Sequence, residues 1–146
     1  MNLKNFTIES SFTEISYGDI WIDLHNDYLW TETINDSKSI KLFYEKREAE
    51  WVNEAAPVWF CIKIDGVKGV WTKENDNDYP IEHLENDKNT PDLFGFGYSG
   101  NEIMDEPTDF KKSSEELEAL IFTFVTGRTL KISGQTAEII ELKNFN

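Results

Sequence analysis

Hydrophobic residues in this chain recur mostly at every second position, in short segments bounded by turn-forming residues. In residues 19–24, Ile20, Ile22 and Leu24 fall on one face, whereas Trp21 falls on the other. This alternation is typical of a half-buried β-strand, because successive side chains of a strand point to opposite faces. The pattern favours a β fold over amphipathic helices, which need apolar residues three or four positions apart.

The segments that follow continue this pattern. Residues 28–34 are rich in aromatic and β-branched residues, and we expect them to pair back on the preceding segment as a hairpin. Residues 38–46 alternate in the same way. Residues 44–52 leave two alternatives open, because this stretch also fits a helix.

The strongest single turn signal is Asp65-Gly66, which lies between residues 57–64 and 67–72. An aspartate-glycine pair between two such segments is typical of a two-residue β-hairpin, so we expect these segments to pair with each other. The end of the chain predicts a three-stranded meander, with strands at residues 119–125, 128–133 and 136–142.

A chain of 146 residues is expected to form a single domain, residues 1–146. Residues 74–118 hold three of the four prolines and a glycine cluster, which indicates an acidic, loop-rich excursion of that domain. A short capped helical turn is expected at residues 113–118. About 8–10 short strands with at most one or two short helices predict a mainly β fold, an antiparallel β-sandwich or barrel.

The charge balance restricts the partners. The chain carries 28 acidic and 14 basic residues, a formal net charge of -14, and residues 74–118 hold 14 of the acids but only three of the bases. Such a field repels nucleic acid and anionic membranes, so we expect neither as a partner, and a basic protein is the natural complement. The sequence has no signal-peptide pattern and no long apolar run, so we expect a cytoplasmic location.

Metal and cofactor motifs are incomplete. Residues 74–85 place acidic side chains with the spacing of an EF-hand loop, but Tyr79 stands where that loop needs glycine, which favours a solvated acidic turn. His25, His83 and Cys61 show no zinc-ligand spacing, and Cys61 lies in an apolar run that favours burial. We expect no metal and no cofactor.

Catalytic patterns are equally incomplete. Gly95, Gly97 and Gly100 match the glycine spacing of a dinucleotide loop, but aromatic residues alternate with them and no helix follows. This run is expected to be an aromatic-glycine strand or bulge. His25 lies between Asp23 and Asp27, but a turn there makes an ordinary surface histidine the simpler interpretation. The sequence contains no nucleophile motif, and we expect no enzymatic activity.

The aromatic residues are the remaining functional material. Five tryptophans, ten phenylalanines and five tyrosines could stack on sugars or anchor a protein partner, although core packing is the commoner role of a tryptophan. The tryptophans are Trp21, Trp30, Trp51, Trp59 and Trp71.

In size, charge and lack of a catalytic motif, the chain resembles the small acidic cytoplasmic immunity proteins that neutralise bacterial toxins. The resemblance implies a bacterial, non-catalytic protein-binding module whose carboxylates mask a basic partner surface; acidic steering would make association fast. The predicted contact residues are Glu102, Asp105, Glu106 and Asp109.

Two alternatives remain open. One is a carbohydrate-binding β-sandwich that uses surface tryptophans, with calcium held in the acidic loop. The other is a structural or regulatory domain of a larger assembly, which would show exposed apolar patches and oligomerisation.

Overall fold

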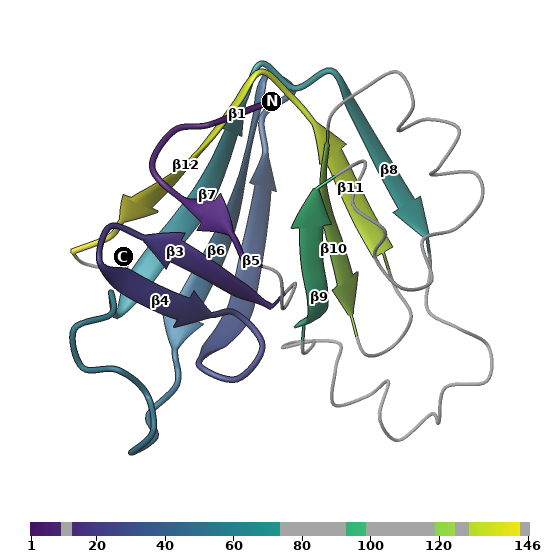
Figure 1. Cartoon of the computed structure of the whole chain (residues 1–146). Coiled ribbons are helices and arrows are strands. Elements are labelled where there is room, and N and C mark those ends of the chain that lie inside the picture. Colours follow the sequence, from purple (N-terminus) through teal and green to yellow (C-terminus); the bar gives the residue numbers. More distant parts are fainter. Residues whose placement is uncertain (10–12, 74–92, 99–118, 125–128, 144–146) are drawn as a thin grey trace.

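The computed structural model describes residues 1–9, 13–73, 93–98, 119–124 and 129–143. Within these residues the chain forms twelve strands in three sheets and no helix (Figure 1), which confirms the mainly β prediction. The predicted helical turn at 113–118 lies outside the described residues. The strands are β1 (Asn2–Leu3), β2 (Thr7–Ile8), β3 (Glu14–Tyr17), β4 (Ile20–Asp23), β5 (Tyr28–Asn35), β6 (Ser39–Lys46), β7 (Trp59–Asp65), β8 (Gly69–Lys73), β9 (Leu93–Tyr98), β10 (Ala119–Phe124), β11 (Thr129–Ser133) and β12 (Thr136–Glu141).

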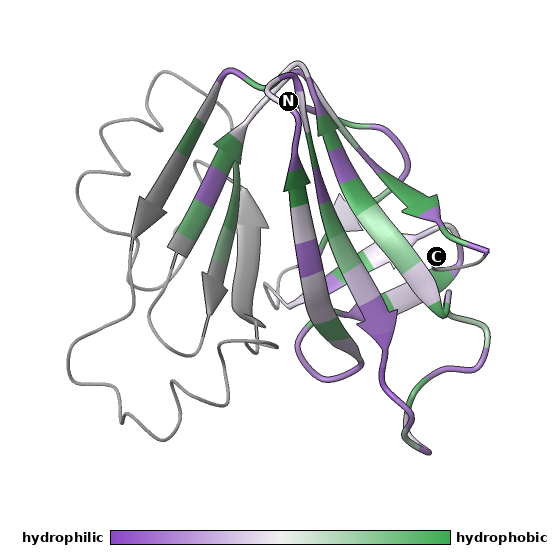
Figure 2. Ribbon diagram, turned by 180° about the vertical axis from the view of Figure 1, so that it is seen from behind, coloured by the Kyte–Doolittle hydropathy of each residue, from purple (hydrophilic) through white to green (hydrophobic). Residues whose placement is uncertain are grey.

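The largest sheet has five strands in the order β1-β12-β7-β6-β5. All its pairs are antiparallel except β1 with β12, which is parallel. The predicted alternation in β6 is confirmed, because Ile40, Leu42 and Tyr44 are buried while Lys41 is half-buried. Seen from behind in Figure 2, hydrophobic and hydrophilic residues alternate along these strands, as expected of a sheet with one face on a core.

The helical alternative for residues 44–52 is wrong. Tyr44 lies opposite Trp30 on β5 and Phe60 on β7, so β6 continues to Lys46 between two strands. Beyond Lys46 the chain forms turns, with Val52 N–H donating to the Ala49 carbonyl at 3.2 Å. Residues 44–46 form a strand and not a helix because their backbone groups pair with strands on both sides.

A second sheet has four strands in the order β8-β11-β10-β9. Residues 119–122 of β10 are all buried, which explains why this strand is a continuous apolar run. The predicted aromatic-glycine strand is confirmed as β9, which contains Gly95 and Gly97 and pairs with β10 through an irregular register near Phe124. Gly100 lies outside the described residues.

The predicted hairpin around Asp65-Gly66 is wrong. Ile64 on β7 lies opposite Ile40 on one side and Ala137 on the other, so both edges of β7 are occupied and β8 cannot return to it. The chain turns at Gly66, whose φ is +62°, and β8 pairs with β11 in the other sheet. The turn signal therefore marks a corner between sheets, a bend by which strands change layers.

The chain between β11 and β12 bends at the same corner as the chain between β7 and β8, as the top of Figure 1 shows. Only the β10–β11 hairpin of the predicted meander is confirmed, because after Gly134 the chain enters β12 of the five-stranded sheet. Two hydrogen bonds join the bent strands: Lys68 N–H donates to the Ser133 carbonyl at 2.8 Å, and Gln135 N–H donates to the Asp65 carbonyl at 2.9 Å. The two sheets are thus joined by one continuous antiparallel pair.

The third sheet is small and has the order β2-β3-β4. The expected pairing of residues 28–34 with 19–24 is wrong, because β4 pairs with β3 and β5 pairs with β6. Gly18 and Asp19 close the β3–β4 hairpin, and the φ of Gly18 is +59°, as the first position of a type II′ turn requires.

One cluster of buried side chains joins the three sheets. It includes Ile15 and Ile22 from the small sheet, Leu42 and Ile62 from the five-stranded sheet, and Phe122 from the four-stranded sheet. Each sheet keeps two edge strands, so the described strands form a sandwich-like arrangement and no closed barrel.

Candidate functional site

The carboxylates predicted as the contact surface, Glu102, Asp105, Glu106 and Asp109, lie outside the described residues. The calcium-like spacing at residues 74–85 lies outside them as well. In the described part of the chain, no group of three or more His, Cys, Asp or Glu side chains is placed to hold a metal ion. That part also contains no helix long and apolar enough to span a membrane.

The four tryptophans whose burial the structure describes differ widely in exposure. Core packing is confirmed for Trp30, which is 9% exposed and donates its indole N–H to the Glu32 carbonyl at 3.1 Å. It is wrong for Trp21 and Trp51, which are 63% and 72% exposed. Trp59 is half-buried on the five-stranded sheet. Among the side chains whose burial is described, two tryptophans therefore face solvent, one on β4 and one in the β6–β7 loop.

Trp21 lies on the outer face of the small sheet, because Ile22 beside it in sequence is fully buried. In the register of this sheet, Ser16 on β3 lies directly opposite both Thr7 on β2 and Trp21 on β4. The neighbouring row places Glu14 opposite Asp23. We call the outward side chains of this sheet the tryptophan face: Thr7, Glu9, Glu14, Ser16, Trp21 and Asp23.

Local hydrogen bonds order the carboxylates of the tryptophan face. The Ser16 hydroxyl donates to the Glu9 carboxylate, and Glu9 N–H donates to the Glu14 carbonyl at 2.9 Å. Asp23 accepts the N–H groups of His25 at 2.9 Å and Asn26 at 3.0 Å through one carboxylate oxygen. This cap closes the β4–β5 turn, so Asp23 contacts the His25 backbone through an ordinary Asx-type turn.

The negative field extends beyond the sheet to Asp27. Partial burial raises the pKa of Asp27, and the charges of Asp23 and, to a smaller extent, Glu14 raise it further. A hydrogen bond from the Asp23 backbone and the charge of Lys46 oppose this increase without cancelling it. Asp27 also accepts the Arg47 N–H through its backbone carbonyl at 2.8 Å. That bond places the turn before β5 beside the start of the β6–β7 loop.

The sequence carried a signal for this face that the charge analysis of long segments missed. Residues 5–37 contain seven acidic residues and no lysine or arginine. Averaging over residues 1–73 hides this run, because the bases of that segment cluster in residues 38–73. Gly18-Asp19 is likewise a hairpin signal that predicts β3 and β4.

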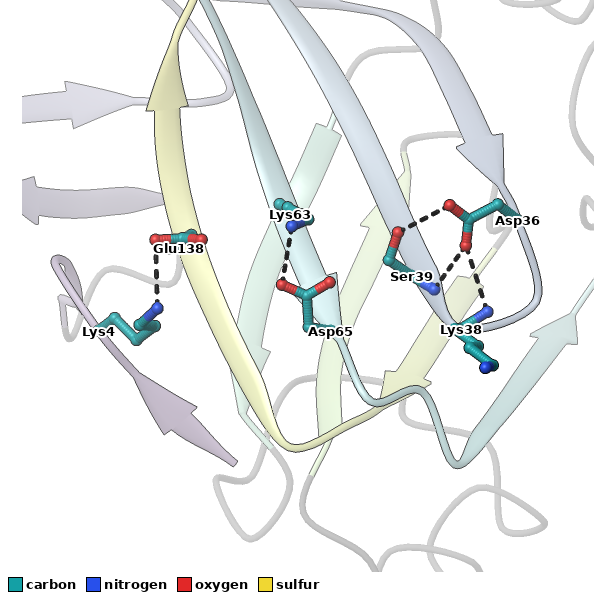
Figure 3. Close-up of polar contacts among 7 residues, drawn as sticks. All are labelled: Lys4, Asp36, Lys38, Ser39, Lys63, Asp65 and Glu138. Atoms are coloured by element: carbon teal, nitrogen blue, oxygen red, sulfur yellow. Dashed lines mark hydrogen bonds and ion pairs between the residues drawn. The ribbon is translucent and has the colours of Figure 1, made fainter.

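The five-stranded sheet has a different charge pattern, with acids and bases paired. Lys63 and Asp65 form an ion pair at 3.0 Å, and Lys4 and Glu138 form one at 3.5 Å (Figure 3). At the β5–β6 turn, Asp36 accepts the Ser39 N–H at 2.8 Å. The lysines that form these ion pairs lie outside residues 5–37, which contain no lysine or arginine.

Two remaining features are structural. Cys61 is 2% exposed, and burial raises the pKa of its thiol, so the expectation of a buried small hydrophobe is confirmed. A shallow pocket of about 290 Å³ borders the tryptophan face. Its lining comes from residues 3–7 together with Ser16 and Gly18.

The tryptophan face offers a flat exposed ring beside several carboxylates on a rigid sheet, an arrangement that can bind the cationic side chains of a protein. Comparison of the chain with models of known protein families, with curated proteins and with solved structures finds no match.

Proposed function

We propose that this chain is a non-catalytic protein-binding module that docks an acidic surface on a basic partner. The observation that carries the proposal is the tryptophan face, where Trp21 is 63% exposed beside Glu14 and Asp23. The mode of action is that of an immunity or inhibitor protein in the cytoplasm: carboxylates occupy the cationic pocket that an anionic substrate would otherwise enter.

Charge and aromatic character support this function in different ways. A net charge of -14 accelerates encounter with a positive surface and excludes anionic competitors. Exposed tryptophan side chains are enriched among the residues that dominate binding energy, because they bury a large rigid area at low entropic cost. The tryptophan face therefore combines long-range electrostatic attraction of a basic partner with a short-range aromatic contact to it.

Glu102, Asp105, Glu106 and Asp109 remain the carboxylates that the sequence nominates, and we assign them to the same partner as a second contact region. Neutralising all four as amides should lengthen the time needed for association, because long-range steering depends on total charge. Replacing Trp21 should instead shorten the lifetime of the complex, because short-range contacts are lost.

Affinity capture from the source cell's lysate at low salt, followed by a salt gradient, tests the proposal. We expect one basic protein in stoichiometric amount, released as ionic strength rises. The double variant Glu14→Lys with Asp19→Lys should lose this protein. Glu32→Lys with Glu54→Lys is the matched control, because it changes the net charge equally at other exposed sites. Equal capture by both variants, or an affinity that is independent of salt, contradicts the proposal.

Carbohydrate binding is the second candidate, because Trp21 and Trp51 are the exposed rings that it requires. A glycan array with and without calcium separates the two functions. Binding of a neutral glycan that is lost in Trp21→Ala and unaffected by salt supports the carbohydrate module over the protein-binding one.

A further inference from the structure

We infer that Trp21 forms the binding site for an arginine side chain of the partner. The guanidinium stacks on the indole and donates hydrogen bonds to carboxylates of the tryptophan face. The inference rests on the proposed function and deepens it by naming the group that is recognised. Trp21 is suited to this role because its backbone is rigid: Ile22 beside it and Ile15 opposite Ile22 are fully buried.

Two carboxylates lie within reach of a cation on this ring. Asp23 is two residues from Trp21 on the same face of β4, a spacing of roughly 7 Å between Cα atoms. Glu14 is diagonal to Trp21 across the β3–β4 pair, a spacing of roughly 7–8 Å that long side chains can bridge. Both oxygens of Asp23 already accept hydrogen bonds, one from the His25 and Asn26 backbone N–H groups and the other from the Asn26 side-chain amide at 2.8 Å, so Glu14 is the freer acceptor.

Arginine fits this geometry better than lysine. Its guanidinium is planar, so it stacks on an indole while its edge N–H groups donate to carboxylates beside the ring. A lysine ammonium is a compact, strongly hydrated charge and makes one of these contacts at a time. Ser16, directly opposite Trp21, is a small neighbour that leaves the ring accessible from the β3 side.

Charge selects the occupant among the alternatives. A second copy of this chain would bring together two molecules of net charge -14, which opposes self-association through this face. A neutral sugar could stack on Trp21 and donate hydroxyl hydrogen bonds to Glu14 or Asp23, but it would leave their negative charges uncompensated. A basic segment of a partner protein uses both features of the face, and residues 5–37, which supply the side chains of the face, contain no lysine or arginine.

A hexa-arginine peptide is the probe, with hexalysine as its matched competitor. Each tryptophan gives one indole N–H signal in a ¹H–¹⁵N NMR spectrum, and single tryptophan-to-phenylalanine variants assign the five signals. We expect hexa-arginine to shift the Trp21 signal most. Trp21→Ala should bind hexa-arginine about two- to fivefold more weakly, the range for an exposed cation–π contact. Hexalysine should depend less on Trp21.

Trp51→Ala is the matched control, because Trp51 is more exposed and lies outside the tryptophan face. Its affinity for hexa-arginine should equal that of the wild type. Glu14→Gln should weaken binding and reduce the preference for arginine over lysine. Unchanged backbone amide spectra away from the face would show that Trp21→Ala is folded, and Trp21→Gln serves as a second variant.

The inference is overturned if the Trp21 signal stays fixed during titration, if Trp21→Ala binds as tightly as the wild type, or if Trp51 responds instead. Its failure is distinguishable from failure of the proposed function. If a basic partner is captured and binds Trp21→Ala as tightly as the wild type, the proposed function is supported and the arginine-binding role of Trp21 is refuted. If arginine stacks on Trp21 but no basic partner is captured, the arginine site stands and the proposed function fails.

Discussion

Tyr28 and Tyr44 pack against the same ring, Phe60, but their hydroxyl groups have different surroundings. The Tyr28 ring meets Phe60 edge-on at 4.9 Å, and its hydroxyl donates to the Pro57 carbonyl at 2.6 Å. The Tyr44 ring stacks on Phe60 at 5.1 Å, and its hydroxyl is buried without a hydrogen-bond partner in the described structure. The same chemical change, tyrosine to phenylalanine, should therefore have opposite effects at the two positions.

The expected magnitudes follow from the hydrogen bonds. A buried hydroxyl without a partner costs roughly 1–3 kcal/mol in protein mutational data, so Tyr44→Phe should raise the free energy of unfolding by about 1 kcal/mol after a small loss of packing. Tyr28→Phe removes a short hydrogen bond and leaves the Pro57 carbonyl less satisfied, which should lower the free energy of unfolding by about 1–2 kcal/mol. In thermal unfolding, 1 kcal/mol corresponds to about 2–4 °C for a chain of this size.

Urea unfolding at pH 7 measures both variants against the wild type. The midpoint should rise for Tyr44→Phe and fall for Tyr28→Phe, with unchanged m-values, because neither change alters the surface exposed on unfolding. A loss of 1 kcal/mol or more in Tyr44→Phe would refute the reasoning. It would mean that the Tyr44 hydroxyl has a polar partner, such as a buried water, whose loss matters.

Alkaline pH provides an independent check. Burial raises the pKa of Tyr44 far above its ordinary value of 10.0. Such a group contributes stability that is fully present below the pKa of the unfolded chain and is lost as pH rises above it, because only the unfolded state then ionises. The loss is roughly 1.4 kcal/mol per pH unit. Stability above pH ~10 should therefore fall less steeply in Tyr44→Phe than in the wild type.

Three further outcomes are expected. Backbone N–H groups of the β5–β6 turn hold the pKa of Asp36 below its ordinary value of 3.8. The contribution of Asp36 to the free energy of unfolding is therefore present above pH 3.8 and lost as pH falls below it. Asp36→Asn should flatten the acidic side of the pH–stability profile measured by urea unfolding. Cys61 is buried with a raised pKa, so a thiol reagent should modify it slowly in the native protein and rapidly in denaturant; fast native labelling would contradict this placement. A Cβ at Gly134 would lie 2.7 Å from an Ile64 side-chain carbon and 3.0 Å from a backbone oxygen, whereas one at Gly18 meets nothing within 4 Å. Gly134→Ala should therefore lower the free energy of unfolding by about 1–3 kcal/mol through crowding, against about 1 kcal/mol of backbone strain for Gly18→Ala. A higher urea midpoint for Gly134→Ala than for Gly18→Ala would argue against a tight corner.

Local patterns predicted the strands well and their pairing poorly. Alternation placed Ile22 and Leu42 in the core, because a strand with one buried face needs no knowledge of its neighbours. Asp65-Gly66 was correct as a turn and wrong as a hairpin. A turn residue determines where the chain bends, but strand pairing depends on which edges are free, and β6 and β12 occupy both edges of β7.

The candidate site shows the same limit. The strand pattern predicted that the side chains of Trp21 and Ile22 lie on opposite faces of their strand. The sequence also contains an acidic run without lysine or arginine at residues 5–37. That Trp21 lies across from Ser16 and near Glu14 depends on the β3–β4 register. The four carboxylates nominated from residues 74–118 are outside the described residues, so their role stays a prediction.

The sequence alone determined the fold class, the strand faces, the burial of Cys61 and the strongly negative charge, because these follow from residue type and from spacing along the chain. Only the tertiary structure decided that β7–β8 and β11–β12 turn together from one sheet to another, and that Trp21 remains exposed while Trp30 is buried. These outcomes depend on contacts between residues far apart in sequence, which local propensity does not encode.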